Sequence, residues 1–108
     1  MRMPGKMVMV MEAFADGRRF HPGVFLKSFD FNANNGSGSW EFTRHIEEAM
    51  KFSNVEAGLR YWNTVCPSRP VRVDGKPNKP LTMFTISLIS AEGATFWNNL
   101  VNNPTGLH

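Results

Sequence analysis

The stretch "LTMFTISLIS", residues 81–90, decides the fold class, because it alternates apolar and polar side chains more regularly than any other part of the chain. Its larger apolar side chains share one face of an extended chain: Phe84, Ile86 and Leu88. This period of two predicts a β-strand with a buried apolar face. We expect a central strand, with a neighbour on each side to hold its register.

Two further strands are predicted in the first third of the chain. Residues 6–14, "KMVMVMEAF", form a short apolar run that ends at Asp16-Gly17, a dipeptide typical of hairpin turns. Residues 23–31, "GVFLKSFDF", alternate again, so we expect a second strand that runs antiparallel to the first. One face of this second strand is expected to carry Phe25, Lys27, Phe29 and Phe31.

The middle of the chain predicts a loop, a short strand and two helices. Residues 32–39, "NANNGSGS", offer no side chain that anchors a core, so we expect a mobile surface loop there and a third strand at 40–43. After Thr43 the apolar period lengthens, which predicts two short helices ending before Pro67. The first has the apolar stripe Ile46, Ala49 and Met50. The second starts at the capping box Ser53 and Glu56 and carries the stripe Val55, Leu59 and Trp62.

This order of elements predicts an α+β fold. A chain of 108 residues that is 42% hydrophobic has the size and composition of a single domain around one core. We expect an antiparallel sheet of three to five strands with a helix pair packed on one face. A mixed sheet stays open as an alternative, because the helical segment is long enough for a parallel crossover. The tail is expected to dock a short helix and then to fray over residues 102–108.

No catalytic or metal-binding pattern is present in the sequence. Cys66 is the only cysteine and three histidines are scattered along the chain, so we expect no disulfide, no zinc site and no cofactor. Cys66 is expected to be a small, part-buried apolar residue, with nothing nearby that lowers its pKa. An enzyme is retained as an alternative in which His45 acts as a general base with Glu47 or Cys66.

The basic loop at residues 66–80 is the strongest candidate for a binding site. Its second part reads "RPVRVDGKPNKP", in which prolines keep the backbone extended and the cations must project into solvent. Two interpretations stay open: a stiff connector, or a loop that binds phosphate or an acidic patch on a protein. Part-exposed aromatic side chains are expected to assist binding. The candidate binding residues are Arg69, Arg72, Lys76, Lys79, Tyr61 and Trp97.

The segments "WEFTRHIEEAMKFSNVEAGLRYW", residues 40–62, and "RPVRVDGKPNKPLTMFTISL", residues 69–88, resemble small phage and prophage proteins of the α+β type. In those proteins an aromatic-Thr strand end leads into two helices, the second of which ends in Tyr-Trp. The resemblance implies a mobile-element origin and a role in binding a host protein, as inhibitors of bacterial defence systems such as CRISPR effectors do. Many such inhibitors are acidic DNA mimics, and the net charge of +3 departs from that route.

Taken together, these features predict a non-catalytic binding protein in the cytoplasm of a bacterial host cell. A protein partner is favoured over nucleic acid because +3 is a small net charge, although nucleic acid is kept as an alternative. No apolar run approaches the length of a membrane span, so no membrane partner is expected. Both a monomer and a homodimer fit the sequence.

Overall fold

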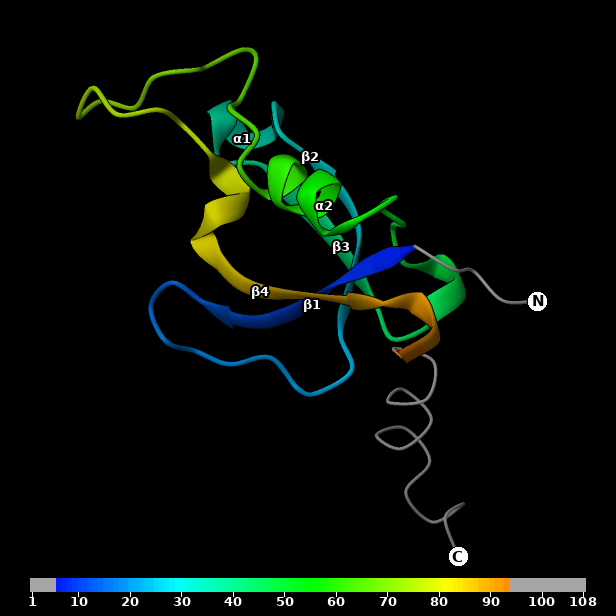
Figure 1. The fold of residues 1–108 in the computed structure, drawn as a ribbon. Helices are drawn as coiled ribbons and strands as arrows, with labels where there is room; N and C mark the ends of the chain where they lie inside the picture. The colour runs from blue at the N-terminus through cyan, green and yellow to red at the C-terminus, as the bar shows by residue number, and fades with distance from the viewer. Residues whose placement is uncertain (1–5, 94–108) are drawn as a thin grey trace, which may run out of the picture.

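The computed structural model describes residues 6–93, which form one α+β domain around a four-stranded sheet (Figure 1). The strand order is β3-β2-β1-β4, and every neighbouring pair is antiparallel. The α+β class and the antiparallel sheet are therefore confirmed, whereas the mixed sheet is not formed. The strands are β1 (Met7–Phe14), β2 (Phe25–Asp30), β3 (Ser39–Thr43) and β4 (Phe84–Ser90).

The helices are short, and the first of the two predicted helices is a single 3₁₀ turn. The backbone becomes extended at Ala49, and the amide of Met50 then donates to the carbonyl of Leu26 at 2.9 Å. The chain thus leaves the helical path where it bonds to the start of β2. The helical elements are α1 (Ala33–Gly36), η1 (Ile46–Glu48), α2 (Val55–Trp62) and η2 (Pro80–Met83).

The helix α2 begins one residue later than the capping box predicts. Asn54, rather than Ser53, is the N-cap, and its side-chain oxygen accepts a hydrogen bond from the amide of Ala57 at 2.7 Å. At the other end, the indole Nε1 of Trp62 donates to the carbonyl of Phe84 at 3.1 Å. Trp62 therefore faces the sheet.

The prediction that residues 81–90 form a central strand is wrong. Among the described residues β4 pairs only with β1, so it is an edge strand, and Ile86 and Leu88 are half-buried rather than buried. The centre of the sheet is held by β1 and β2. The reason lies in the composition of β1, whose apolar side chains occur on both faces and which therefore needs cover on both faces.

A β-bulge also breaks the predicted alternation in β2. The register between β2 and β3 shifts between Leu26 and Ser28, which places one extra residue in β2. As a result Phe25 belongs to the core on one face of the sheet, while Phe29 packs into the core on the other face. These side chains therefore do not share a face, although their sequence spacing predicts that they do.

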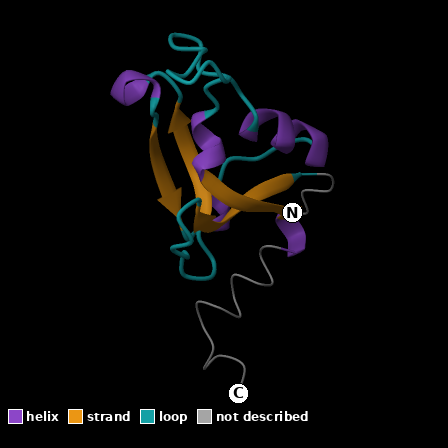
Figure 2. Ribbon diagram, turned by 90° about the vertical axis from the view of Figure 1, so that its left-hand side faces the viewer, coloured by secondary structure: helices purple, strands orange, loops and turns teal. Residues whose placement is uncertain are grey.

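Two apolar clusters sandwich the sheet, which Figure 2 shows as one twisted layer. The smaller cluster contains Val8, Val10 and Phe25, and η1 closes it. The larger one lies under α2 and contains most of the aromatic rings. Ring contacts run through it without a break, joining Phe20, Phe14, Phe84, Phe42, Trp40, Phe29, Phe31, Tyr61 and Phe52.

Some of the expectations concern residues outside the described range. The predicted docked helix of the tail, with Trp97, and the predicted fraying at 102–108 both lie there. Within residues 6–93, no helix has the length and apolar character needed to cross a membrane.

Candidate functional site

Residues 66–80 form a hairpin-like arm that projects from the body of the domain, near the end of α1 in Figure 1. A single antiparallel bridge joins Val71 to Pro77. At the tip the amide of Arg72 donates to the carbonyl of Lys76 at 2.8 Å, and Gly75 takes a φ of +86°, which the reversal of the chain requires. The arm is thus an ordered hairpin built around the Asp-Gly turn.

Asn78 fastens the base of the arm to α1. Its side-chain amide donates to the carbonyls of Gly36 and Arg69, both at 2.9 Å, and its own carbonyl accepts from the amide of Cys66 at 2.8 Å. Three backbone groups from two distant segments therefore depend on one asparagine. This contact joins the arm to the segment that the sequence predicts as a mobile loop.

That segment, residues 32–39, forms a tight turn against the arm. Asn34 and Asn35 take left-handed φ values of 53° and 58°, which asparagine tolerates better than most residues. Gly36 is buried, and a Cβ there would lie 2.9 Å from the Cβ of Arg69. The side-chain oxygen of Asn32 accepts from the amide of Ser68 at 3.0 Å. Glycine and asparagine in this segment therefore allow the arm to approach closely.

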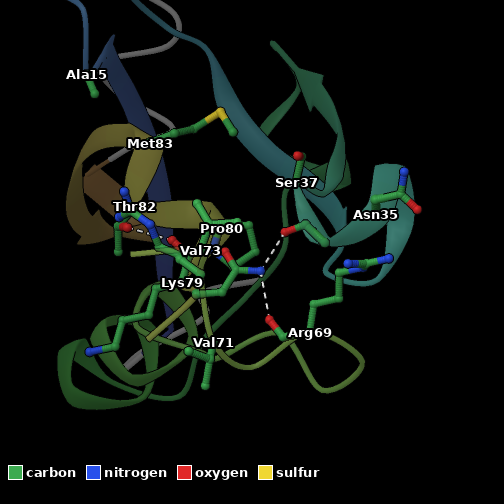
Figure 3. A pocket seen from close by; sticks show the side chains of 13 residues that line it. Ala15, Asn35, Ser37, Arg69, Val71, Val73, Lys79, Pro80, Thr82 and Met83 are labelled. Atoms are coloured by element: carbon green, nitrogen blue, oxygen red, sulfur yellow. Dashed lines mark hydrogen bonds between the residues drawn. The ribbon is translucent and has the colours of Figure 1, made fainter. Parts of the chain in front are cut away.

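A hollow of about 540 Å³ lies between the arm, α1 and η2, and we call it the basic groove (Figure 3). Figure 3 shows Arg69 and Lys79 on either side of it. Three cations and no acidic side chain line the groove, so its lining is positively charged. The lining residues are Ala15, Asn35, Gly36, Ser37, Arg69, Val71, Arg72, Val73, Asn78, Lys79, Pro80, Thr82 and Met83.

The four predicted cations occupy different electrostatic settings. Arg72 forms an ion pair with Asp74, with 3.2 Å between its Nη2 and the carboxylate Oδ2. Among the described residues Arg69 and Lys79 form no ion pair, so their charges are available to a ligand. Lys76 lies at the tip of the arm and does not line the groove. The structure thus brings three of the four cations together.

Exposed valines on the arm form part of the site that the sequence interpretation missed. Val71 is 62% exposed, and Val73, next to the turn, is fully exposed. The sequence does contain a signal for these valines: Val71, Arg72 and Val73 alternate apolar and charged side chains directly before the turn residues Asp74-Gly75. The arm therefore offers apolar contacts as well as charge.

Cys66 lies at the base of the arm in a polar setting, which corrects the expectation that nothing lowers its pKa. The hydroxyl of Ser68 lies 3.5 Å from Sγ and the amide of Arg69 donates to Sγ at 3.3 Å. The hydrogen bond with Ser68, helped by the Arg69 amide, lowers the pKa of the thiol, although burial acts in the opposite direction. The side chain is fully buried, so these contacts stabilise the arm's base.

Of the two predicted aromatic binding residues, Tyr61 belongs to the described part of the chain. Tyr61 is half-buried, with its ring centroid 5.2 Å from that of Phe31 and 5.4 Å from that of Phe52. Trp97 lies outside the described residues. The most exposed ring among residues 6–93 is Trp40 on the edge strand β3, at 39%. Tyr61 therefore packs within the domain. The exposed apolar side chains of the arm are those of Val71 and Val73.

His45 lies on the solvent-exposed surface. Its Nδ1 is 3.9 Å from a carboxylate oxygen of Glu47, and both side chains project into solvent. Neither the basic groove nor a second hollow of about 410 Å³, beside Phe20 and Phe42, is lined by His45, Glu47 or Cys66. Within residues 6–93, no group of three or more His, Cys, Asp or Glu side chains is placed to hold a metal ion.

Comparison with protein-family models, with curated proteins and with solved structures finds no match to this chain. The candidate site therefore rests on its own geometry: a basic groove, an ordered arm and an exposed apolar tip.

Proposed function

We propose that this chain is a non-catalytic binding protein whose arm docks onto an acidic surface of a protein partner. The observation that carries the proposal is the basic groove, which three cations and no acid line. Arg69 and Lys79 have no ion pair among the described residues, so a partner's carboxylates gain two charge-assisted hydrogen bonds without breaking existing ones.

The exposed valines favour a protein over a nucleic acid as the partner. Val73 is fully exposed, and burying a valine side chain on binding contributes about 1.5 kcal/mol. Single-stranded nucleic acid is instead bound by aromatic rings on which its bases stack, and no aromatic residue lines the basic groove. An apolar tip beside cations fits a protein surface where an apolar pocket adjoins acidic residues.

The resemblance to phage and prophage proteins suggests the class of partner. On that resemblance we expect the target to be a bacterial host protein, including an effector of a defence system, and we expect the complex to form in the bacterial cytoplasm. The domain would act by occupying a surface of that effector rather than by chemistry.

The test compares two variants of equal charge for binding to proteins of a bacterial host lysate. In the arm variant, serine replaces Arg69, Arg72, Lys76 and Lys79; in the control, serine replaces Arg18, Arg19, Lys27 and Arg60. Each set removes four positive charges from a chain of +3 and leaves −1. A partner captured by the wild type and the control should be lost by the arm variant and by Val73→Asp.

Salt dependence separates the two kinds of partner. Binding to single-stranded oligonucleotides through several phosphates should weaken steeply as salt rises, whereas a protein complex anchored by valines should respond less. Nucleic acid becomes the partner if the wild type binds an oligonucleotide in a salt-sensitive way and the arm variant does not. A partner that binds the arm variant as tightly as the wild type would show the arm to be a connector.

A further inference from the structure

The outer edge of β4 is unusually unprotected. Among residues 6–93 no strand pairs with it, and β4, "FTISLIS", has seven residues without a charge, a proline or a glycine. Edge strands are normally guarded by such residues against pairing with another chain. The opposite edge, β3, does carry a charge, at Glu41. β4 therefore lacks the residues that normally prevent an edge strand from pairing with another chain.

The direction of the backbone groups in β4 follows from the hydrogen bonds at its two ends. The amide of Ala91 donates to the carbonyl of Lys6 at 2.9 Å, and the carbonyl of Met83 accepts from the amide of Ala15 at 2.6 Å. Odd-numbered residues of β4 therefore face β1, since backbone groups alternate along a strand. The even-numbered residues direct their amides and carbonyls outward: Phe84, Ile86, Leu88 and Ser90.

The helix α2 lies over the same outer edge of β4. Trp62 bonds to the carbonyl of Phe84, which is one of the outward groups, so this side of α2 stands over the edge of β4. Val55 and Leu59 recur with Trp62 at i, i+4 and i+7 and so lie on the same side of the helix. Both are exposed, at 45% and 43%. An apolar strip thus overhangs an unpaired strand edge.

A close contact between Gly58 of α2 and Leu88 of β4 holds the helix against the sheet. Gly58 packs directly on Leu88, where a Cβ would lie 2.6 Å from a methyl carbon of the leucine. The helix therefore lies low over β4, and a strand added beside β4 would place its side chains against Val55 and Leu59. Of the apolar stripe predicted for α2, only Trp62 packs against the sheet within one chain. The added strand would cover Val55 and Leu59.

We propose that the partner strand is β4 of a second copy, which gives a twofold-symmetric dimer with a continuous eight-stranded sheet. The register that pairs the outward groups sets Leu88 opposite Leu88 of the other protomer, and Ile86 opposite its Ser90. Each of these pairs exchanges two backbone hydrogen bonds. The carbonyl of Phe84, already occupied by Trp62, is not needed.

The lack of charge in β4 and the apolar side chains near its edge favour a second copy of this chain as the source of the added strand. Because β4 carries no charge, antiparallel pairing with itself brings no like charges together. The axis stands perpendicular to the sheet, so both α2 helices lie on one face with their apolar strips turned toward each other. The apolar side chains Ile86 and Leu88 of the second copy lie on this same face and supply the cover that Val55 and Leu59 lack.

Sedimentation of the full chain from low micromolar to near-millimolar concentration tests the proposal. The wild type should form a dimer, and Val55→Lys/Leu59→Lys should raise the dissociation constant at least about a hundredfold, because four lysines would meet at the axis. Both positions are exposed, so the variant should fold. Glu56→Lys on the solvent side of α2 changes the charge by the same +2 and should leave the dimer intact.

Hydrogen exchange locates the interface independently of any substitution. The outward amides of Ile86 and Leu88 should exchange more slowly as protein concentration rises, whereas the amide of Thr85, bonded to β1, should be protected at all concentrations. A wild type that stays monomeric overturns the proposal. So does a dimer that Val55→Lys/Leu59→Lys leaves unchanged, or protection of these amides that appears only when a different protein is added.

Discussion

Gly58 is the residue at which local preference and tertiary packing conflict most clearly. In an isolated helix, alanine is favoured over glycine by about 1 kcal/mol. Here the added Cβ would lie 2.6 Å and 2.8 Å from the two methyl carbons of Leu88, and one of these groups must move. We therefore expect Gly58→Ala to destabilise the domain by about 1–2 kcal/mol, the net of overpacking and helix preference. Urea unfolding measures this change.

Leu88→Val provides the control for Gly58→Ala. It removes bulk at the point of contact, so it should recover part of the loss when the two substitutions are combined, even though it is destabilising alone. A Gly58→Ala variant more stable than the wild type would show that α2 shifts away from β4 without cost.

Tyr61 gives the domain a pH-dependent contribution to stability. Burial raises the pKa of Tyr61, so the folded state favours the neutral phenol. The contribution is fully present below the pKa of an unfolded tyrosine, about 10, and is lost as the pH rises above it. Tyr61→Phe should flatten this alkaline loss. Since Tyr61 is the only tyrosine, tyrosinate absorbance reports its pKa directly, and a midpoint at or below about 10 would contradict the assignment.

At the scale of elements, the side chain of Asn78 ties the base of the arm to α1. Asn78→Asp keeps the shape of the side chain but removes both donated hydrogen bonds and sets a carboxylate against the carbonyls of Gly36 and Arg69. We expect a loss of about 1–3 kcal/mol, confined to the base of the arm. Hydrogen exchange should become faster at the amides of Cys66 and Ser68, while the amide of Met11 in β1, which donates to the carbonyl of Val24, serves as the control. An unchanged exchange rate at Cys66 would mean that the arm is held by other contacts.

At the scale of the whole molecule, the arm and the core are separate. Arg69 and Arg72 are exposed, Lys79 is half-buried, and none of the three belongs to either apolar cluster. Replacing them and Lys76 with serine should therefore change the free energy of unfolding by less than about 0.5 kcal/mol. Equilibrium unfolding of the arm variant checks this. Loss of folding in that variant would make the arm part of the structural core.

The sequence alone determined the class of the fold and the position of the basic arm. Alternation in residues 81–90 and the apolar run of β1 are local signals, and a β-strand needs little more than such a pattern to be recognised. The cations of the arm were found for the same reason, since clustered lysine and arginine side chains must face water. The helix at 55–62 followed from its own period, with an error of one residue at the cap.

Only the tertiary structure decided what depends on contacts between distant residues. The edge position of β4 follows from the strand order, and the bulge after Leu26 moves Phe29 to the other face of the sheet, which no period of two reveals. The basic groove exists because Asn78 and Gly36, 42 residues apart, hold the arm against α1. Val55 and Leu59 remained exposed because Gly58 sets which side of α2 meets the sheet. A local pattern indicates the kind of element, but packing decides which face each side chain joins and which face is covered.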